Sequence, residues 1–117
     1  MTQKEKDLLI KDLCARLPYN VKIETLDGPQ IFDIRWLSIN MCNIANPYLP
    51  YLFPLSTMTE EQKIIYGDLC YQIINATPFE IQNCFNELYD WLIKNNFDYQ
   101  GLIPKGLAID ATNLNIY

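Results

Sequence analysis

The chain has no histidine in 117 residues. Histidine is the commonest general base, the usual partner of a Ser or Cys nucleophile and a frequent zinc ligand. Its absence excludes a catalytic triad of the ordinary type. The chain also has only four glycines, spread from position 28 to position 106, so no Gly-rich phosphate-binding loop is present. We therefore expect a protein that is not an enzyme and that carries no cofactor.

No pair of cysteines has the spacing of a metal site. Cys14, Cys42, Cys70 and Cys84 lie 28, 28 and 14 residues apart, without a Cys-x-x-Cys pair. Three of them (Cys14, Cys70 and Cys84) fall on or beside apolar helical stripes. Free cysteine behaves as a small hydrophobic residue, so these three are predicted to be buried. The environment of Cys42 is left open, and no metal is expected.

Basic residues are too few and too scattered for general nucleic-acid binding. Nine Lys and Arg stand against fourteen Asp and Glu, giving a net charge of −5, and contacts to phosphates need clustered positive charge. Paired carboxylates can support glycoside hydrolysis. Here Glu60 and Glu61 begin a helix, where the helix dipole explains them, and Asp68, Glu87 and Asp90 take polar helical positions. We expect all five to lie on solvated faces.

Long apolar runs are missing as well. No stretch approaches the roughly 20 apolar residues needed to span a bilayer, and residues 1–7 are charged and lack a signal-peptide core. Half of the residues are hydrophobic and 13% are aromatic, which suits a packed core. We expect one domain over residues 1–117, located in the cytoplasm with reduced thiols.

Three helices are predicted from their start signals. In each, a threonine is followed three residues later by Glu or Gln, the pattern of a capping box. The first helix ends before Pro18, the second runs to about residue 75, and the third ends before Asn95 and Asn96. The second is expected to bury Ile65, Leu69 and Ile73. The three pairs are Thr2 with Glu5, Thr59 with Gln62, and Thr77 with Glu80.

Strands are predicted in two places. Residues 21–25 alternate apolar and polar side chains, and residues 31–39 are rich in strand formers. Asp27-Gly28 between them is a strong turn signal, so these segments predict a β-hairpin. Residues 107–109 form a short apolar run that we expect to add an edge strand to this hairpin.

A proline-rich segment, 47–55, follows the hairpin. Its prolines rule out a regular helix and favour an extended stretch that wraps the core. Rigid segments that carry rings present contact area at low entropic cost, and aromatic residues are enriched at interface hot spots. One hypothesis is that rings here and after the third helix bind a protein partner; the other is that they cover the core. The residues are Tyr48, Tyr51, Phe53, Phe97 and Tyr99.

A pocket for a small, nucleotide-like ligand is the alternative. It would need an aromatic ring beside a basic group, and Arg35 next to Trp36 is the adjacent pair of that kind in the chain. Neighbouring side chains on a strand point to opposite faces, which weakens this alternative.

Three stretches resemble a family of small proteins from gut Bacteroidetes genomes and their phages and mobile elements. They are KDLCARLPY (11–19), PYLFPLSTMTEE (50–61) and FDYQGLIPKGLA (97–108). Relatives carry a His pair where this chain has Asn95-Asn96, and an acidic residue in place of Pro104. Chemistry built on that His pair cannot be carried over. The resemblance implies a small accessory protein of a phage or integrated element, without indicating an activity.

Together these observations predict an α+β protein with three main helices packed on a small antiparallel sheet, made of a hairpin and a short C-terminal strand. We expect a non-enzymatic accessory protein that binds a host or viral protein, with small-ligand binding as the alternative. Neither membrane insertion nor general nucleic-acid binding is expected. The sequence leaves open whether the chain forms a homo-oligomer.

Overall fold

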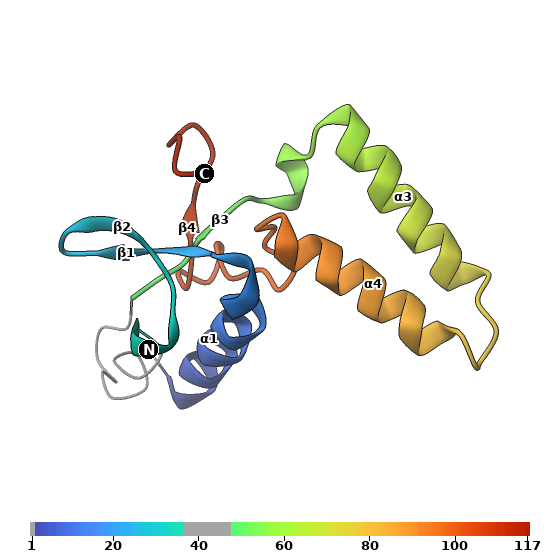
Figure 1. Cartoon of the computed structure of the whole chain (residues 1–117), viewed down its shortest axis with the longest axis horizontal. Helices are drawn as coiled ribbons and strands as arrows, with labels where there is room; N and C mark the ends of the chain where they lie inside the picture. The colour runs from blue at the N-terminus through green and yellow to red at the C-terminus, as the bar shows by residue number, and fades with distance from the viewer. Residues whose placement is uncertain (1, 37–47) are drawn as a thin grey trace.

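The computed structural model describes residues 2–36 and 48–117, and its fold is α+β as predicted. Figure 1 shows a body, formed by the N-terminal helix and the strands, from which two antiparallel helices project as an arm. Among the described helices, none is both long and apolar enough to cross a membrane. The elements are α1 (Gln3–Arg16), β1 (Lys22–Thr25), β2 (Gly28–Ile31), β3 (Tyr51–Leu52), α3 (Glu60–Ile74), α4 (Ile81–Lys94) and β4 (Ile109–Asp110), with 3-10 turns at 17–19 and 55–57.

The hairpin β1–β2 is antiparallel, with Lys22 opposite Ile31 and Thr25 opposite Gly28. Its second strand is shorter and earlier than predicted, because pairing stops at Ile31. Asp33 Oδ1 accepts a hydrogen bond from the Arg35 N–H (2.9 Å), and residues 34–36 are helical. The prediction of a strand over 31–39 is therefore wrong for 32–36, of which 32 and 33 belong to no regular element and 34–36 are helical. Positions 37–39 lie outside the described residues.

The C-terminal strand pairs with a different neighbour from the one predicted. β4 lies parallel to β3, with Tyr51 opposite Ile109, so the prediction that it extends the hairpin is wrong. The proline-rich segment occupies that position instead. Ile23 bridges Pro50, and Glu24 N–H donates to Leu49 O (2.9 Å). Residues 49–52 are thus extended and lie between the hairpin and β4, in agreement with the prediction that the proline-rich segment wraps the core. Pro47 lies outside the described residues.

The core of the body lies between α1, the strands and the segment 102–108. Leu9 and Leu13 bring α1 into it, and both are fully buried. Cys14 is exposed, so its predicted burial is wrong; it lies about 100° around the helix from Leu13, on the solvent side. Cys70 and Cys84 are half-buried, and Cys42 is outside the described residues. The core residues are Leu9, Leu13, Val21, Ile23, Phe32, Leu52, Leu102, Leu107 and Ala108.

Two of the three predicted helix starts are confirmed. Both partners of the capping box are bonded at the start of α1, between Thr2 and Glu5, and at the start of α3, between Thr59 and Gln62. The third prediction is early by about one turn. The N–H groups of residues 80 and 81 both donate to Thr77 O at 3.0 Å, which closes a separate turn before regular helix begins at residue 81.

The arm is an α-helical hairpin in which α3 packs along α4 (Figure 1). Its own core, the arm cluster, consists of Met58, Leu88, Leu92 and Phe97, with partly buried side chains around them. No residue of α3 is fully buried. Leu69 and Ile73 are half-buried, as their stripe predicts, whereas Ile65 is 39% exposed, against prediction. A single layer of contact with α4 leaves the rest of α3 to solvent.

Hydrogen bonds connect the C-terminal residue, Tyr117, to two strands of the body. Tyr117 Oη donates to Tyr51 O (2.7 Å) and accepts from the Lys22 N–H (2.9 Å), and Lys22 Nζ donates to Ile116 O (2.7 Å). Burial raises the pKa of Tyr117 to about 12, so the hydroxyl keeps its proton at neutral pH. The last residue thereby joins β1 to β3.

Tyr117→Phe is expected to lower the free energy of unfolding by about 1–2 kcal/mol, because it removes two hydrogen bonds at once. Urea unfolding at pH 7 measures the change. Tyr71→Phe is the matched control: Tyr71 is 66% exposed, and we expect its loss of a hydroxyl to change stability by less than about 0.5 kcal/mol. Equal effects of the two substitutions would show that the C-terminal bonds do not stabilise the fold.

Candidate functional site

The five rings predicted from the sequence to bind a partner do not form one exposed patch. Tyr51 and Phe97 are 7% and 2% exposed and belong to the interior. Tyr48, Phe53 and Tyr99 are half-buried. Each packs on a different neighbour: the Tyr48 ring on Trp36, the Phe53 ring on Tyr117 and the Tyr99 ring on Tyr89. Among these five, only the half-buried rings offer surface to a partner.

The alternative pair, Arg35 and Trp36, is not joined into a pocket. The exposed Arg35 guanidinium binds the Asp33 carboxylate at 2.8 Å, and this hydrogen bond lowers the pKa of Asp33. The Trp36 ring meets the Tyr48 ring edge-on, with centroids 5.1 Å apart. The two side chains therefore have separate partners.

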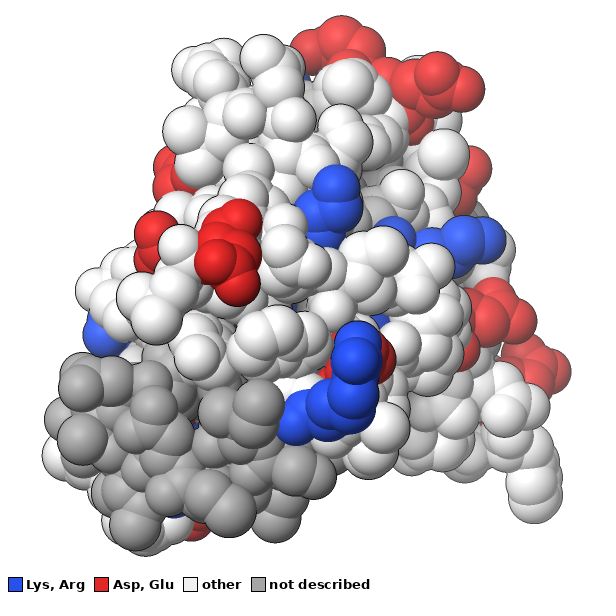
Figure 2. Space-filling model, turned by 60° about the vertical axis from the view of Figure 1, so that its left-hand side comes forward, with Lys and Arg blue, Asp and Glu red and all other residues white. Residues whose placement is uncertain are grey.

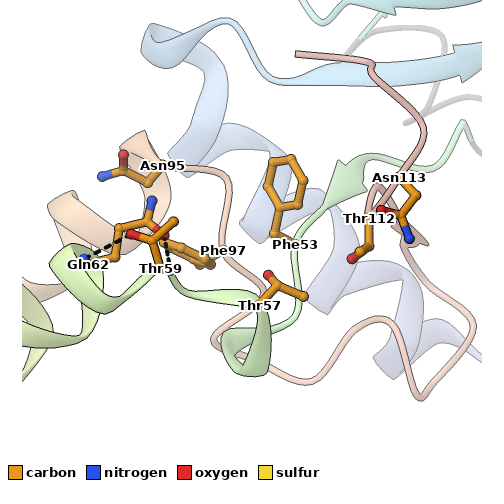
Figure 3. A pocket seen from close by; sticks show the side chains of 8 residues that line it. All are labelled: Phe53, Thr57, Thr59, Gln62, Asn95, Phe97, Thr112 and Asn113. Carbon is orange, nitrogen blue, oxygen red and sulfur yellow. Dashed lines mark hydrogen bonds between the residues drawn. The ribbon is translucent and has the colours of Figure 1, made fainter.

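A cavity of about 290 Å³ lies where the arm meets the body (Figure 3). Its described lining holds no charged side chain, and most of its polar side chains are bonded locally. Thr59 and Gln62 bond each other's main chain in the capping box, Thr57 Oγ1 donates to Pro54 O, and Asn95 Nδ2 donates to Trp91 O. These groups stabilise turns and helix ends, so they are not free to select a ligand. The lining residues are Phe53, Thr57, Thr59, Gln62, Asn95, Phe97, Thr112 and Asn113.

The charges visible on the body do not separate into a basic and an acidic patch. Figure 2 shows one face, on which Lys and Arg alternate with Asp and Glu across a mostly uncharged surface. Within 2–36 and 48–117, no three His, Cys, Asp or Glu side chains gather closely enough to hold a metal ion.

A buried ion pair lies under the junction of body and arm. Asp12 and Arg16 have fully buried side chains, and Arg16 Nε donates to Asp12 Oδ2 at 2.7 Å. Arg16 Nη2 also donates to Phe97 O (2.7 Å), which connects α1 to the segment after α4. Burial raises the pKa of Asp12, although the hydrogen bond from Arg16 acts in the opposite direction. The sequence carried one signal of this pair, an Asp and an Arg four residues apart in a predicted helix.

Three rings form a continuous row from the arm to this ion pair. The Phe85 and Tyr89 rings stack at 6.0 Å, and Tyr89 meets Tyr99 at 5.4 Å. The Tyr99 ring then lies 5.8 Å from the Arg16 guanidinium carbon. Tyr89 is 41% exposed and the other two rings are half-buried. We call Phe85, Tyr89 and Tyr99 the aromatic row; sequence reasoning identified Tyr99 and missed the two rings on α4.

Most of the net charge is concentrated on the arm. Residues 60–94 contain six carboxylates and two lysines, a net charge of −4, out of −5 for the whole chain. Large apolar side chains are exposed on the same segment, including Ile64, Tyr71, Ile74 and Phe79. The arm is thus both acidic and apolar.

Comparisons of the chain with protein-family models, with curated proteins and with solved structures found no match.

Proposed function

We propose that the chain is a protein-binding protein whose aromatic row receives a partner segment bearing Arg or Lys. The observation that carries this proposal is the row itself: three partly accessible rings in contact, two of them on an arm of net charge −4. The faces of aromatic rings attract cations, at about 0.5–2 kcal/mol for each contact. An acidic surrounding raises the local concentration of a basic partner and speeds its association.

The existing contact of Arg16 with Tyr99 supports this mode of binding. A guanidinium already lies over the inner side of the row, 5.8 Å from the ring centroid. A partner's Arg or Lys would use the outer side, where Tyr89 is accessible. Tyrosine and arginine are both enriched among residues that dominate binding energies. The row therefore offers a preorganised surface whose rings are already fixed by their neighbours.

This role agrees with the accessory function that the resemblance to phage and mobile-element proteins implies. Such a protein acts by binding a host or viral protein, and needs no catalytic group. The small-ligand alternative has less support, because Arg35 is engaged with Asp33 and the cavity at the base of the arm has locally bonded polar groups.

Site-specific photo-crosslinking tests the proposal. Benzoylphenylalanine in place of Tyr89 is expected to capture a protein in host lysate, and the crosslinked peptide is expected to contain Arg or Lys beside apolar residues. The matched control carries the same group at Leu26, which is 98% exposed at the hairpin turn. Capture of the same proteins at both positions, or of peptides without basic residues, would contradict the proposal.

Once the partner is identified, Tyr89→Ala is expected to weaken binding by about 30-fold, the effect of a hot-spot residue. Affinity should fall as salt is raised, because the attraction between an acidic arm and a basic segment is screened. Leu26→Ala serves as the control and should leave the affinity unchanged. An affinity independent of both Tyr89 and salt would assign the binding to another surface.

A further inference from the structure

We infer that α3 pairs with α3 of a second copy of the chain, through an apolar face of α3 that α4 does not cover. Three large side chains on this face are exposed: Ile64 by 68%, Tyr71 by 66% and Ile74 by 80%. With Gly67 they follow a spacing of three, four and three residues, which places all four on one side of a helix. We call these four residues the outer stripe.

The outer stripe is separate from the contact with α4. The side chains of α3 that pack into the arm cluster are Tyr66, Leu69, Cys70 and Ile73. At about 100° per residue the two sets occupy separate, neighbouring arcs of the helix, with centres about 120° apart. A helix in a two-helix hairpin normally has one apolar face, turned toward its neighbour, and a polar face toward water. α3 has two apolar faces, and one of them is left uncovered by the described residues 2–36 and 48–117.

No contact among the described residues of a single copy requires glycine at position 67, in the middle of the outer stripe. Glycine is the least favourable helix residue after proline. A Cβ at position 67 would meet nothing within 4 Å, and the backbone there is not in a left-handed conformation. Neither local crowding nor turn geometry therefore requires glycine. The distance between two packed helices depends on the side chains at their crossing point, and a glycine there allows a second backbone to come close.

The outer stripe fits a copy of itself. It has a gap at Gly67 and large side chains on either side of it, so in a two-fold arrangement Ile64 or Tyr71 of one copy can lie over Gly67 of the other. An antiparallel arrangement also keeps the acidic starts of the two α3 helices apart, although Asp68 lies beside the crossing point. Glu60 and Glu61 lie at the start of α3, and residues 69–79 carry no charge. The two acidic ends are then separated by about 20 Å, the length of the helix.

The available area is that of a modest dimer. Ile64, Tyr71 and Ile74, with Phe79 beyond the end of α3, are between 66% and 95% exposed. At roughly 200 Å² for each large side chain, they contribute on the order of 600 Å² per copy. The pair would bury about 1,200 Å², the lower end of the range for specific interfaces. We therefore expect a dissociation constant in the micromolar range, and a four-helix arrangement of two arms.

Sedimentation velocity of the full chain between about 1 and 300 μM tests this inference. The expected result is a monomer at the low end, a dimer at the high end, and tighter pairing in high salt, because salt screens the repulsion between two acidic arms. A chain that stays monomeric at 300 μM would overturn the inference. A dimer that weakens with salt would also overturn it, because an ionic contact would then hold the copies together.

Gly67→Leu separates this interface from any other. It should raise the melting temperature of the dilute monomer, because leucine is a better helix former than glycine, and weaken the dimer at least tenfold by blocking the close approach. Gln72→Leu is the matched control, an added leucine on the exposed surface of α3 but outside the outer stripe; it should leave the dimer intact. Equal dimerisation of Gly67→Leu and the parent chain would overturn the inference. The aromatic row would still stand, since its test uses Tyr89 on α4.

Discussion

Arg16→Met is expected to lower the free energy of unfolding by about 3–5 kcal/mol at pH 7. The substitution leaves Asp12 buried without its partner and removes the donor to Phe97 O. A buried carboxylate without a counter-charge must either stay ionised in a poorly solvating interior or take up a proton. Urea unfolding followed by tryptophan fluorescence measures the loss.

The size of this loss should depend on pH. Burial already raises the pKa of Asp12 above its ordinary value of 3.8, so the folded state holds this proton more tightly than the unfolded chain. The contribution of Asp12 to stability is therefore greatest at low pH and declines as pH rises through the raised pKa. Without Arg16 the pKa rises further, and the deficit of Arg16→Met should be larger at pH 7 than at pH 4.5.

A double variant, Asp12→Leu with Arg16→Met, is the control for this explanation. Replacing a buried ion pair by apolar residues is often close to neutral, so the double variant should regain most of the stability and lose the pH dependence. It should not regain all of it, because Phe97 O still lacks its donor. A double variant less stable than Arg16→Met would contradict the view that an unpaired charge is the cause.

Asp98→Ala is expected to cost about 2–5 kcal/mol. The Asp98 side chain is 7% exposed and accepts hydrogen bonds from the N–H groups of Leu102 and Ile103, both at 2.8 Å. Alanine leaves these two donors unpaired, and each unpaired buried group costs about 1–3 kcal/mol. Because Leu102 is fully buried, the loop 98–103 cannot simply turn its main chain to water.

Hydrogen exchange locates this effect. In Asp98→Ala the amides of Leu102 and Ile103 should exchange much faster, while those of the α1 core residues Leu9 and Leu13 should change only as much as global stability does. Asp98→Asn retains one acceptor oxygen and should lose roughly half as much stability. Unchanged exchange at positions 102 and 103 in the alanine variant would show that the carboxylate does not hold the loop.

Local signals in the sequence predicted the local structure well. The capping boxes at Thr2 and Thr59 set the starts of α1 and α3, because each satisfies main-chain donors through residues only three positions apart. The turn at Asp27-Gly28 marked the hairpin, where Gly28 has a φ of 92°. Such features depend on a few neighbouring residues, so they form independently of the tertiary contacts of the rest of the chain.

Predictions that needed distant neighbours were less successful. Residues 31–39 contain strand formers, yet Asp33 redirects the chain into a helical turn. The β4 strand has no local signal for its partner, and it pairs with β3 across more than fifty residues of sequence. Burial of Cys14 was inferred from its place beside an apolar stripe, but Asp12 and Arg16 take the buried positions through their mutual ion pair.

The candidate site was predicted only in part. Aromatic composition suggested ring-based recognition, and Tyr99 is a member of the aromatic row. Tyr51 and Phe97 proved to be interior residues. Phe85 and Tyr89 were overlooked because the pattern of α4 describes which residues face inward. The pattern does not indicate that the Phe85 and Tyr89 rings form a row with Tyr99, which lies beyond the end of α4.

The base of the arm has a consequence for how the protein can be rearranged. Phe53 and Phe97 lie side by side, joined by main-chain hydrogen bonds from Phe53 N–H to Asn96 O (2.8 Å) and from Asp98 N–H to Phe53 O (2.9 Å). The chain therefore leaves the body and returns to it at one point, as the ends of a tolerated domain insertion do. In topological terms the arm is an insertion in the body, with its two ends next to each other. We expect a body with a short turn in its place, or the same body carrying a foreign helical hairpin, to keep its strand pairings, although it would lose the contact between α1 and α4.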